Sequence, residues 1–302
     1  MLKRFLMIVC ILLPAQSLVG TSLATSQQHL REFWRGIVKS KFAVPQGESA
    51  DSLAPELSAL LTSPDPELRD ELAYSILAVW IHRDRFSTTT LLSLTDQWRS
   101  NLKSGLGESE TNSVLIRSFS ALCLSEIARH EAKSPFMGAE RYHRLVTEAS
   151  DYLQAERDLR GYDPALHWIH ATAHTADLLA ALADSPLLTK EEGSQILHAI
   201  DTRLATAPQV YTQGEQDRLA AAVVSVIGRK DFDASTFESW LAALQGEDRD
   251  VWTATTPPAL ARYQNHNDLL QALTVRLSLE EHAQQMAQYR EKVLALLAKR
   301  IE

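Results

Sequence analysis

Cysteine is scarce in this chain of 302 residues, which contains only Cys10 and Cys123. Cys10 lies in an apolar run near the N-terminus, at residues 5–13, so loss of that run would leave Cys123 alone. A single cysteine cannot form an internal disulfide, and the fold must then be stabilised by its hydrophobic core. Cys123 itself follows Ser118-Phe-Ser-Ala-Leu, and we expect it to be a small buried hydrophobic residue.

Glycine and proline are also infrequent, at 11 residues each, and no segment is of low complexity. The sequence has no Gly-rich phosphate loop, no Gly-x-Ser-x-Gly nucleophile elbow and no Cys-x-x-Cys pair. These absences disfavour phosphate-loop chemistry, elbow-type hydrolases and dithiol redox chemistry.

Basic residues are outnumbered, because 30 Lys and Arg stand against 38 Asp and Glu. An acidic chain without a basic block is a poor candidate for binding nucleic acid or anionic lipid. No apolar run reaches the length of about 20 residues that a membrane-spanning helix needs. We therefore expect no nucleic-acid partner and no integral membrane span in the mature chain. The expected partner is a protein or a small-molecule ligand, which the sequence does not identify.

The first 24 residues have the pattern of a signal peptide. Lys3 and Arg4 precede the apolar run, and Ser22-Leu23-Ala24 has the small-x-small pattern of a signal peptidase site. We expect residues 25–302 to be exported, to the periplasm or the extracellular space, as a single α-helical domain. That mature chain carries 28 basic and 38 acidic side chains, a net charge of −10. A retained N-terminal anchor is the alternative.

Helix signals recur along the rest of the chain, whereas strand signals do not. Asp65-Pro66 and Asp163-Pro164 each combine a capping residue with a proline suited to the first helical turn. Thr189–Glu192 and Ser278–Glu281 have the form of capping boxes. The expected helices span about 27–41, 52–62, 66–79, 87–102, 110–130, 139–159, 163–183, 189–205, 215–229, 235–245, 258–276 and 279–300.

Pairs of these helices begin near residues 66, 111, 164, 215 and 258, at steps of about 40 to 50 residues. This spacing is the period of helical-hairpin repeats of the HEAT and armadillo kind. The predicted fold class is therefore all-α. An α-α superhelix or toroid of HEAT-like hairpins is the first choice, and an irregular helical bundle is the alternative.

The expected helix 163–183 carries a polar stripe on a surface that is otherwise apolar or small. At about 100° per residue, His170, His174 and Asp177 fall within about 60° of one another. Such a helix should be buried, and its polar side chains must then face a cavity or polar partners. Three interpretations are open: these three residues hold a divalent metal, they form a ligand or acid–base site without metal, or they form a buried structural network.

Further charged and aromatic residues are candidates for the same site. We expect the stripe to face the ends of Glu156, Arg160 or Arg117, and arginines there would bind an anionic part of a substrate. The alternatives are a surface role for Arg117 and a simple surface pair between Glu215 and Arg218. The full set of predicted binding residues is Arg117, Glu156, Asp158, Arg160, Trp168, Glu215 and Arg218.

Five short stretches resemble, in this order, a bacterial family known as domain of unknown function number 2785. They are Pro66–Asp70, Arg117–Ser120, Glu156–Gly161, Trp168–Asp177 and Gly214–Arg218. The resemblance covers about residues 55–245, and the stretch Trp-x-His-x-x-x-His-x-x-Asp is its most specific part. The family has Gly before that Trp, where this chain has His167. The resemblance implies a helical domain in which these polar residues converge, and it implies no activity.

Three functions are therefore open. The first is a binding or interaction module, in which a polar pocket of His, Asp and Arg side chains takes an unidentified ligand. The second is a hydrolytic enzyme, with or without a metal, that uses His170 or His174 as general base or ligand and Asp177 as the orienting group. The third is a structural protein of the cell envelope without a small-molecule site.

Overall fold

The computed structural model describes residues 29–249, 251–253, 255–279, 284 and 286–301. The predicted signal peptide lies outside these residues. The elements, in chain order, are α1 (Arg31–Lys39), α2 (Ala50–Leu60), the π-helix η1 (Glu67–Tyr74), α3 (Ser75–His82), α4 (Thr88–Asn101), α5 (Ser113–Lys133), α6 (Ala139–Ala155), β1 (Tyr162–Asp163), β2 (His167–Trp168), α7 (Ala171–Ala183), α8 (Lys190–Thr206), α9 (Glu215–Ile227), α10 (Ala234–Glu247), α11 (Pro257–Arg276) and α12 (Ala287–Ile301). The all-α prediction is confirmed.

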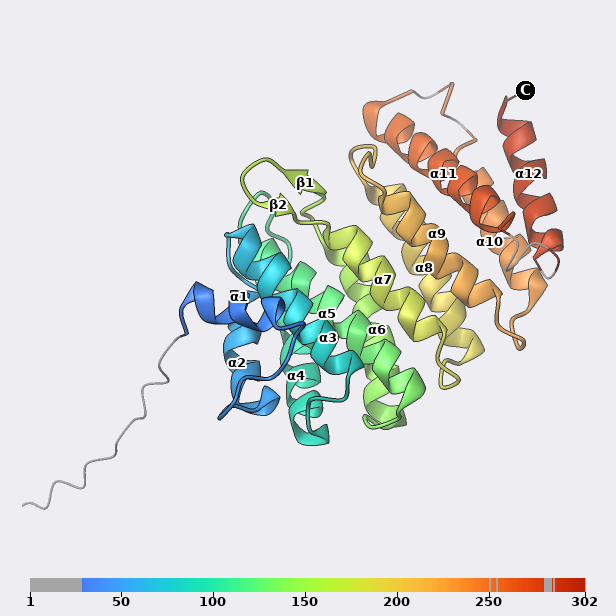
Figure 1. Ribbon diagram of the computed structural model, residues 1–302. Helices are drawn as coiled ribbons and strands as arrows, with labels where there is room; N and C mark the ends of the chain where they lie inside the picture. Colours follow the sequence, from blue (N-terminus) through green and yellow to red (C-terminus); the bar gives the residue numbers. More distant parts are fainter. Residues whose placement is uncertain (1–28, 250, 254, 280–283, 285, 302) are drawn as a thin grey trace, which may run out of the picture.

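The helices form two rows that run side by side through the molecule (Figure 1). In one row, α3 packs on α5, α5 on α7, α7 on α9 and α9 on α11. In the other row, α2 packs on α4, α6 on α8, α8 on α10 and α10 on α12. Successive helices cross between the rows, as stacked helical hairpins do. Buried apolar side chains from both rows join into one core.

Helix α7 lies in the middle of this arrangement, between α5 and α9 (Figure 1). Every residue of α7 except Ala180 is buried, which agrees with the buried helix predicted from its alanine and leucine content. Small side chains allow the neighbouring helices to approach closely, and α7 therefore contacts α5, α6 and α9. The polar side chains on α7 must accordingly find partners inside the protein.

Several predicted helix starts are confirmed by their caps. The Asp65 carboxylate accepts hydrogen bonds from the backbone N–H groups of Glu67 and Leu68 at the start of η1. Thr189 and Glu192 form the predicted capping box of α8. The box predicted at Ser278–Glu281 falls partly outside the described residues. Among the helices that the structure describes, none combines the length and the apolar character needed to cross a membrane.

Two predicted boundaries are wrong around the candidate site. Helix α6 ends at Ala155, so Glu156 to Arg160 lie in a loop and not at the end of a helix. Residues 163–170 are not helical either, because the chain forms the antiparallel hairpin β1–β2 and α7 begins only at Ala171. The Asp163 carboxylate accepts hydrogen bonds from the backbone N–H groups of Ala165 and Leu166, which closes the hairpin turn. The signal at Asp163-Pro164 thus marks a turn.

Candidate ligand-binding pocket

The hairpin β1–β2 is held over the end of η1 by one buried arginine. Arg69 is fully buried, and its guanidinium donates to the carbonyl oxygens of Leu166, at 2.6 Å, and Trp168, at 3.4 Å. The same group binds both carboxylate oxygens of Asp70, at 2.6 and 3.2 Å. π-helices are rare, and those that occur often lie at functional sites. The π-helix η1 supplies both Arg69 and Asp70. Arg69 therefore fixes where the hairpin, and with it Trp168, is placed.

His170 is the residue at which the hairpin turns into α7. Its φ of 50° lies in the left-handed region, which non-glycine residues seldom adopt. Its Nε2 lies 3.0 Å from the backbone oxygen of Gln213 and 3.5 Å from a carboxylate oxygen of Glu215, and its ring stacks on Trp168 with the ring centres 4.7 Å apart. Burial acts to raise the pKa of Glu215, but hydrogen bonds from His170 and from backbone N–H groups outweigh it and lower that pKa.

His174 lies one turn further along α7 and is 9% exposed. Its Nδ1 is 2.8 Å from the hydroxyl oxygen of Ser118 on α5, and that hydroxyl also contacts the backbone oxygen of Ile169. The ring of Phe119 packs edge-on against the imidazole, with the centroids 5.1 Å apart. The pKa of His174 is lowered to about 3, mainly by burial of the imidazole and to a smaller extent by nearby positive charges. The imidazole is therefore neutral at physiological pH.

Asp177 completes the predicted stripe, but it faces a different partner from the one expected. One terminal nitrogen of Arg218 on α9 contacts both oxygens of its carboxylate, at 2.8 and 2.7 Å. Arg218 keeps 51% of its side chain exposed, whereas Asp177 is buried. The expectation that Glu156, Arg160 or Arg117 faces the stripe is therefore wrong, because α9, rather than the loop after α6, packs on this side of α7.

A pocket of about 530 Å³ opens where the hairpin and the N-terminal ends of α7 and α9 meet. Its apolar lining consists of Tyr74, Phe119, Leu122 and Trp168. Its polar lining consists of Asp70, His170, His174, Gln213, Asp217 and Arg218, with Gly214 beside them. Four of the predicted residues line this pocket: Trp168, His170, His174 and Arg218. Two more lie behind it, where Asp177 pairs with Arg218 and Glu215 contacts His170.

The other predicted residues form a separate buried network that does not line the pocket. Arg117 is fully buried and pairs with both carboxylate oxygens of Glu156, at 2.6 and 2.9 Å. Asp158 binds Arg160 at 2.6 Å and accepts the backbone N–H of Glu110 at 2.8 Å. These contacts join the loop after α6 to the segment before α5. The network therefore stabilises two loops against each other.

Sequence reasoning missed several residues of the pocket. Asp70, Phe119, Gly214 and Asp217 lie inside the stretches that carry the family resemblance, and that signal was sufficient to include them. The same holds for Ser118, which lies behind the pocket and contacts His174. Tyr74, Leu122 and Gln213 lie outside those stretches and carry no sequence signal, since only the packing of η1, α5 and α9 brings them together.

The donors suggested for a metal do not form a metal site. Within the described parts of the chain, no three His, Cys, Asp or Glu side chains are grouped so that they could hold an ion. His170 and His174 have their ring centres 5.9 Å apart and nearly perpendicular rings, and Asp177 is paired with Arg218. The pocket is lined by aromatic rings, two imidazoles and carboxylates.

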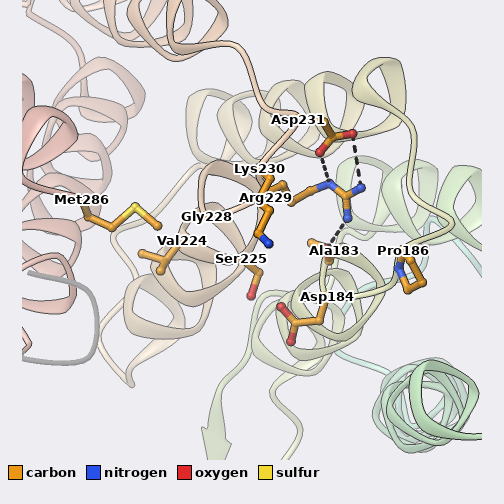
Figure 2. A pocket seen from close by; sticks show the side chains of 10 residues that line it. All are labelled: Ala183, Asp184, Pro186, Val224, Ser225, Gly228, Arg229, Lys230, Asp231 and Met286. Atoms are coloured by element: carbon orange, nitrogen blue, oxygen red, sulfur yellow. Dashed lines mark hydrogen bonds and ion pairs between the residues drawn. The ribbon is translucent and has the colours of Figure 1, made fainter. Parts of the chain in front are cut away.

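A second pocket, of about 830 Å³, lies at the opposite ends of the same two helices (Figure 2). It is lined by the C-terminal ends of α7 and α9 and by Met286. Arg229 stabilises the fold there, because it donates hydrogen bonds to the backbone oxygens of Ala183, at 3.0 Å, and Ser185, at 2.7 Å, and pairs with Asp231. Its other charged side chains include Asp184 and Lys230, which are exposed.

Comparison with known proteins gives one match. Residues 102–275, more than half of the chain, match the model of a family described as protein of unknown function DUF2785. No curated protein and no solved structure matches the chain. The match begins later and ends later than the expected span of 55–245, and it includes every pocket residue except Asp70 and Tyr74. The chain belongs to the DUF2785 family of proteins of unknown function.

Proposed function

We propose that this protein binds a small organic molecule in the pocket between the hairpin β1–β2 and the N-terminal ends of α7 and α9. The observation that carries the proposal is the second ring nitrogen of His174. The imidazole is nine-tenths buried, yet its Nε2 has no hydrogen-bond partner among the described residues and is not sealed off in the interior. This nitrogen therefore reaches the pocket, where a ligand can donate a hydrogen bond to it.

The hydrogen bonds around Ser118 determine the tautomer of His174. A carbonyl oxygen only accepts, so the single hydroxyl hydrogen of Ser118 is donated to the backbone oxygen of Ile169. The Ser118 oxygen must then accept from His174, and the imidazole hydrogen is therefore on Nδ1. Nε2 is left without a hydrogen and acts as an acceptor in the pocket. Ligands that present an N–H or O–H group to it are favoured.

A hydrolytic enzyme is the second candidate, because a serine oxygen and an imidazole nitrogen 2.8 Å apart resemble a nucleophile and its base. Three observations count against it. Ser118 is fully buried, Asp177 pairs with Arg218 rather than with His174, and the pKa of His174 of about 3 is far below the pH at which a general base works best. Binding is therefore the better supported function.

We also propose that binding takes place outside the cytoplasm, in the periplasm or the extracellular space. The support is the sequence of residues 1–24, with its basic start, apolar run and small-x-small site. The test is to express the full chain in a bacterial host with cell fractionation and to measure the mass of the product. Export with loss of residues 1–24 is expected, and retention of the uncut chain in the cytosol would contradict the proposal.

The binding proposal is tested by screening a library of small fragments, with cationic, neutral and anionic members, against the purified protein by ligand-observed NMR. Fragments are expected to bind the wild type and to lose binding in Trp168→Leu, which removes the exposed aromatic wall. Binding is expected to persist in Lys230→Ala, which alters the pocket of Figure 2.

Two results would contradict the binding proposal. One is a complete absence of fragment binding, and the other is binding that Trp168→Leu leaves unchanged. The enzyme candidate has its own readout, which is turnover of a panel of aryl esters. Turnover that His174→Gln abolishes, without loss of folded protein, would favour hydrolysis over binding.

A further inference from the structure

We propose that the ligand is an organic amine, a cationic ammonium group carried on a flat apolar body. This inference rests on the binding function proposed above and names the class of ligand for the same pocket. Three independent features point to it: the charge of the walls, the aromatic rings, and the acceptor nitrogen of His174.

The walls of the pocket carry an excess of negative charge. Asp70 and Asp217 line it, and Asp177 and Glu215 lie directly behind. Two of these carboxylates are balanced by arginines, since Arg218 binds both oxygens of Asp177 and the fully buried Arg69 binds Asp70. The excess is therefore that of Asp217 and of Glu215, which lies against His170. Asp217 is exposed in the first turn of α9 and has no arginine or lysine within ion-pair distance in the described parts of the chain. A cation in the pocket would offset this charge.

Three aromatic rings provide a surface for an apolar body and for a cation. Trp168 stacks one face on His170 and is 44% exposed, so part of its indole remains free. The hydroxyl of Tyr74 donates to Glu126 at 3.0 Å, which leaves its ring as the part that lines the pocket. Phe119 already holds a cation, because the Arg69 guanidinium lies 4.7 Å from its ring centre. Aromatic faces attract ammonium groups in this way.

The Nε2 of His174 determines the direction of a hydrogen bond with a ligand. His174 Nε2 has no hydrogen to donate, so a carboxylate ligand would meet lone pairs there, whereas a ligand N–H would be accepted. The ammonium charge itself is placed toward Asp217, because the charges of His170, Arg218 and Arg69 that lower the pKa of His174 also disfavour a cation at the imidazole. The N-terminus of α9 opens on the same pocket and by itself would favour an anion. Its first turn is, however, filled by Glu215 and Asp217, and Glu215 already accepts the backbone N–H of Gln213 at 2.9 Å.

The test uses three probes of similar shape: phenethylamine, 3-phenylpropionate and 2-phenylethanol. Their dissociation constants for the purified full chain are measured by ligand-observed NMR titration at pH 7. Phenethylamine is expected to bind tightest. Asp217→Asn should weaken the amine by about two- to fivefold and leave the alcohol unchanged. Trp168→Leu should weaken the amine by about tenfold.

Asp184→Asn is the matched control, because Asp184 is an exposed aspartate at the other end of α7, in the pocket of Figure 2. It should change none of the three dissociation constants. If 3-phenylpropionate or the alcohol binds tighter than the amine, and Trp168→Leu abolishes that binding, the ligand class is wrong and the binding function stands. If Asp217→Asn and Asp184→Asn weaken the amine equally, the proposed role of Asp217 is refuted. If no probe binding depends on Trp168, the binding function fails as well.

Discussion

The Nδ1 of His174 lies 2.8 Å from the hydroxyl oxygen of Ser118, a residue 56 positions earlier in the chain. Helices α5 and α7 bring the two together in the core, and the same hydroxyl satisfies the backbone oxygen of Ile169 at the end of the hairpin. One buried serine thus fixes both the imidazole and the last residues before α7. This relationship explains how a neutral acceptor nitrogen is held at the pocket.

Ser118→Ala is expected to lower the free energy of unfolding by about 1–3 kcal/mol, because two buried polar groups lose their partner. In the wild type, nitrogen-15 NMR of the imidazole should show His174 with its hydrogen on Nδ1. The variant should show a mixture of both tautomers, since nothing then fixes the Nδ1 hydrogen. A wild-type imidazole with its hydrogen on Nε2 would refute the hydrogen-bond assignment.

The stability of the protein should depend on pH through His174. Burial, ahead of the charges of His170, Arg218 and Arg69, lowers the folded-state pKa to about 3 from 6.5. Between these two values the unfolded chain binds a proton that the folded chain does not, so stability falls as the pH falls from 6.5 towards 3 and is fully present above 6.5. The contribution is about 1.4 kcal/mol per pH unit within this window.

The measurement is urea unfolding of the wild type and of His174→Gln at several pH values between 6.5 and 4.5. Other groups titrate in both proteins, and the difference between the two slopes therefore isolates His174. The wild type should lose stability more steeply. Equal slopes in the two proteins would mean that His174 titrates as an exposed histidine.

Arg117→Met should be strongly destabilising, by about 3–5 kcal/mol, because it leaves the carboxylate of Glu156 buried without its cation. The matched control is Arg141→Met. Arg141 keeps 44% of its side chain exposed and lies 3.7 Å from Asp96, so its loss should cost less than about 1 kcal/mol. Urea unfolding measures both. Similar losses in the two variants would contradict a structural role for the buried pair.

Gly161→Ala should disturb the hairpin and the pocket together. A Cβ at this position would lie 2.1 Å from the side-chain oxygen of Gln213 and 2.6 Å from a carboxylate oxygen of Glu215. Moving Gln213 breaks its hydrogen bond with the backbone N–H of Tyr162, at a cost of about 1–3 kcal/mol. We also expect weaker binding of any ligand that depends on Trp168.

Gly246→Ala serves as the control, because Gly246 lies in α10 with open space around it, and alanine favours a helix. Thermal unfolding should show a lower midpoint for Gly161→Ala and an equal or higher one for Gly246→Ala. A Gly161→Ala protein as stable as the wild type would show that the close approach to Gln213 is not required.

Much of the fold was predictable because its signals are local. The three- and four-residue periodicity places ten of the twelve expected helices within a few residues of their observed positions, and the caps at Asp65 and Thr189 form as predicted. The burial of α7 followed from its composition. The same burial predicted that the polar side chains of α7 contact partners inside the protein.

The residues of the pocket were predictable only in part. His170 and His174 could be found because polar groups on a helix that is expected to be buried need partners, whereas Trp168 and Arg218 lie in the stretches that carry the family resemblance. Ser118, Asp70 and Asp217 lie in such stretches as well, but the sequence does not say what they contact, since they are common residue types on the surfaces of helices. Pairing Asp177 with Arg218 rather than with Arg117 required knowing that α9, and not the loop after α6, packs beside α7.

The hairpin shows most clearly where local information ends. The sequence by itself determined that Asp163-Pro164 would redirect the chain, because an aspartate before a proline can cap a helix or close a turn equally well. Only the tertiary structure decided between the two. Arg69, 97 positions from Leu166, binds the backbone oxygen of Leu166 in the hairpin, and a helix over these residues would use that oxygen internally. Long-range hydrogen bonds of this kind decide the conformation where the local preferences for a helix cap and for a turn are nearly equal.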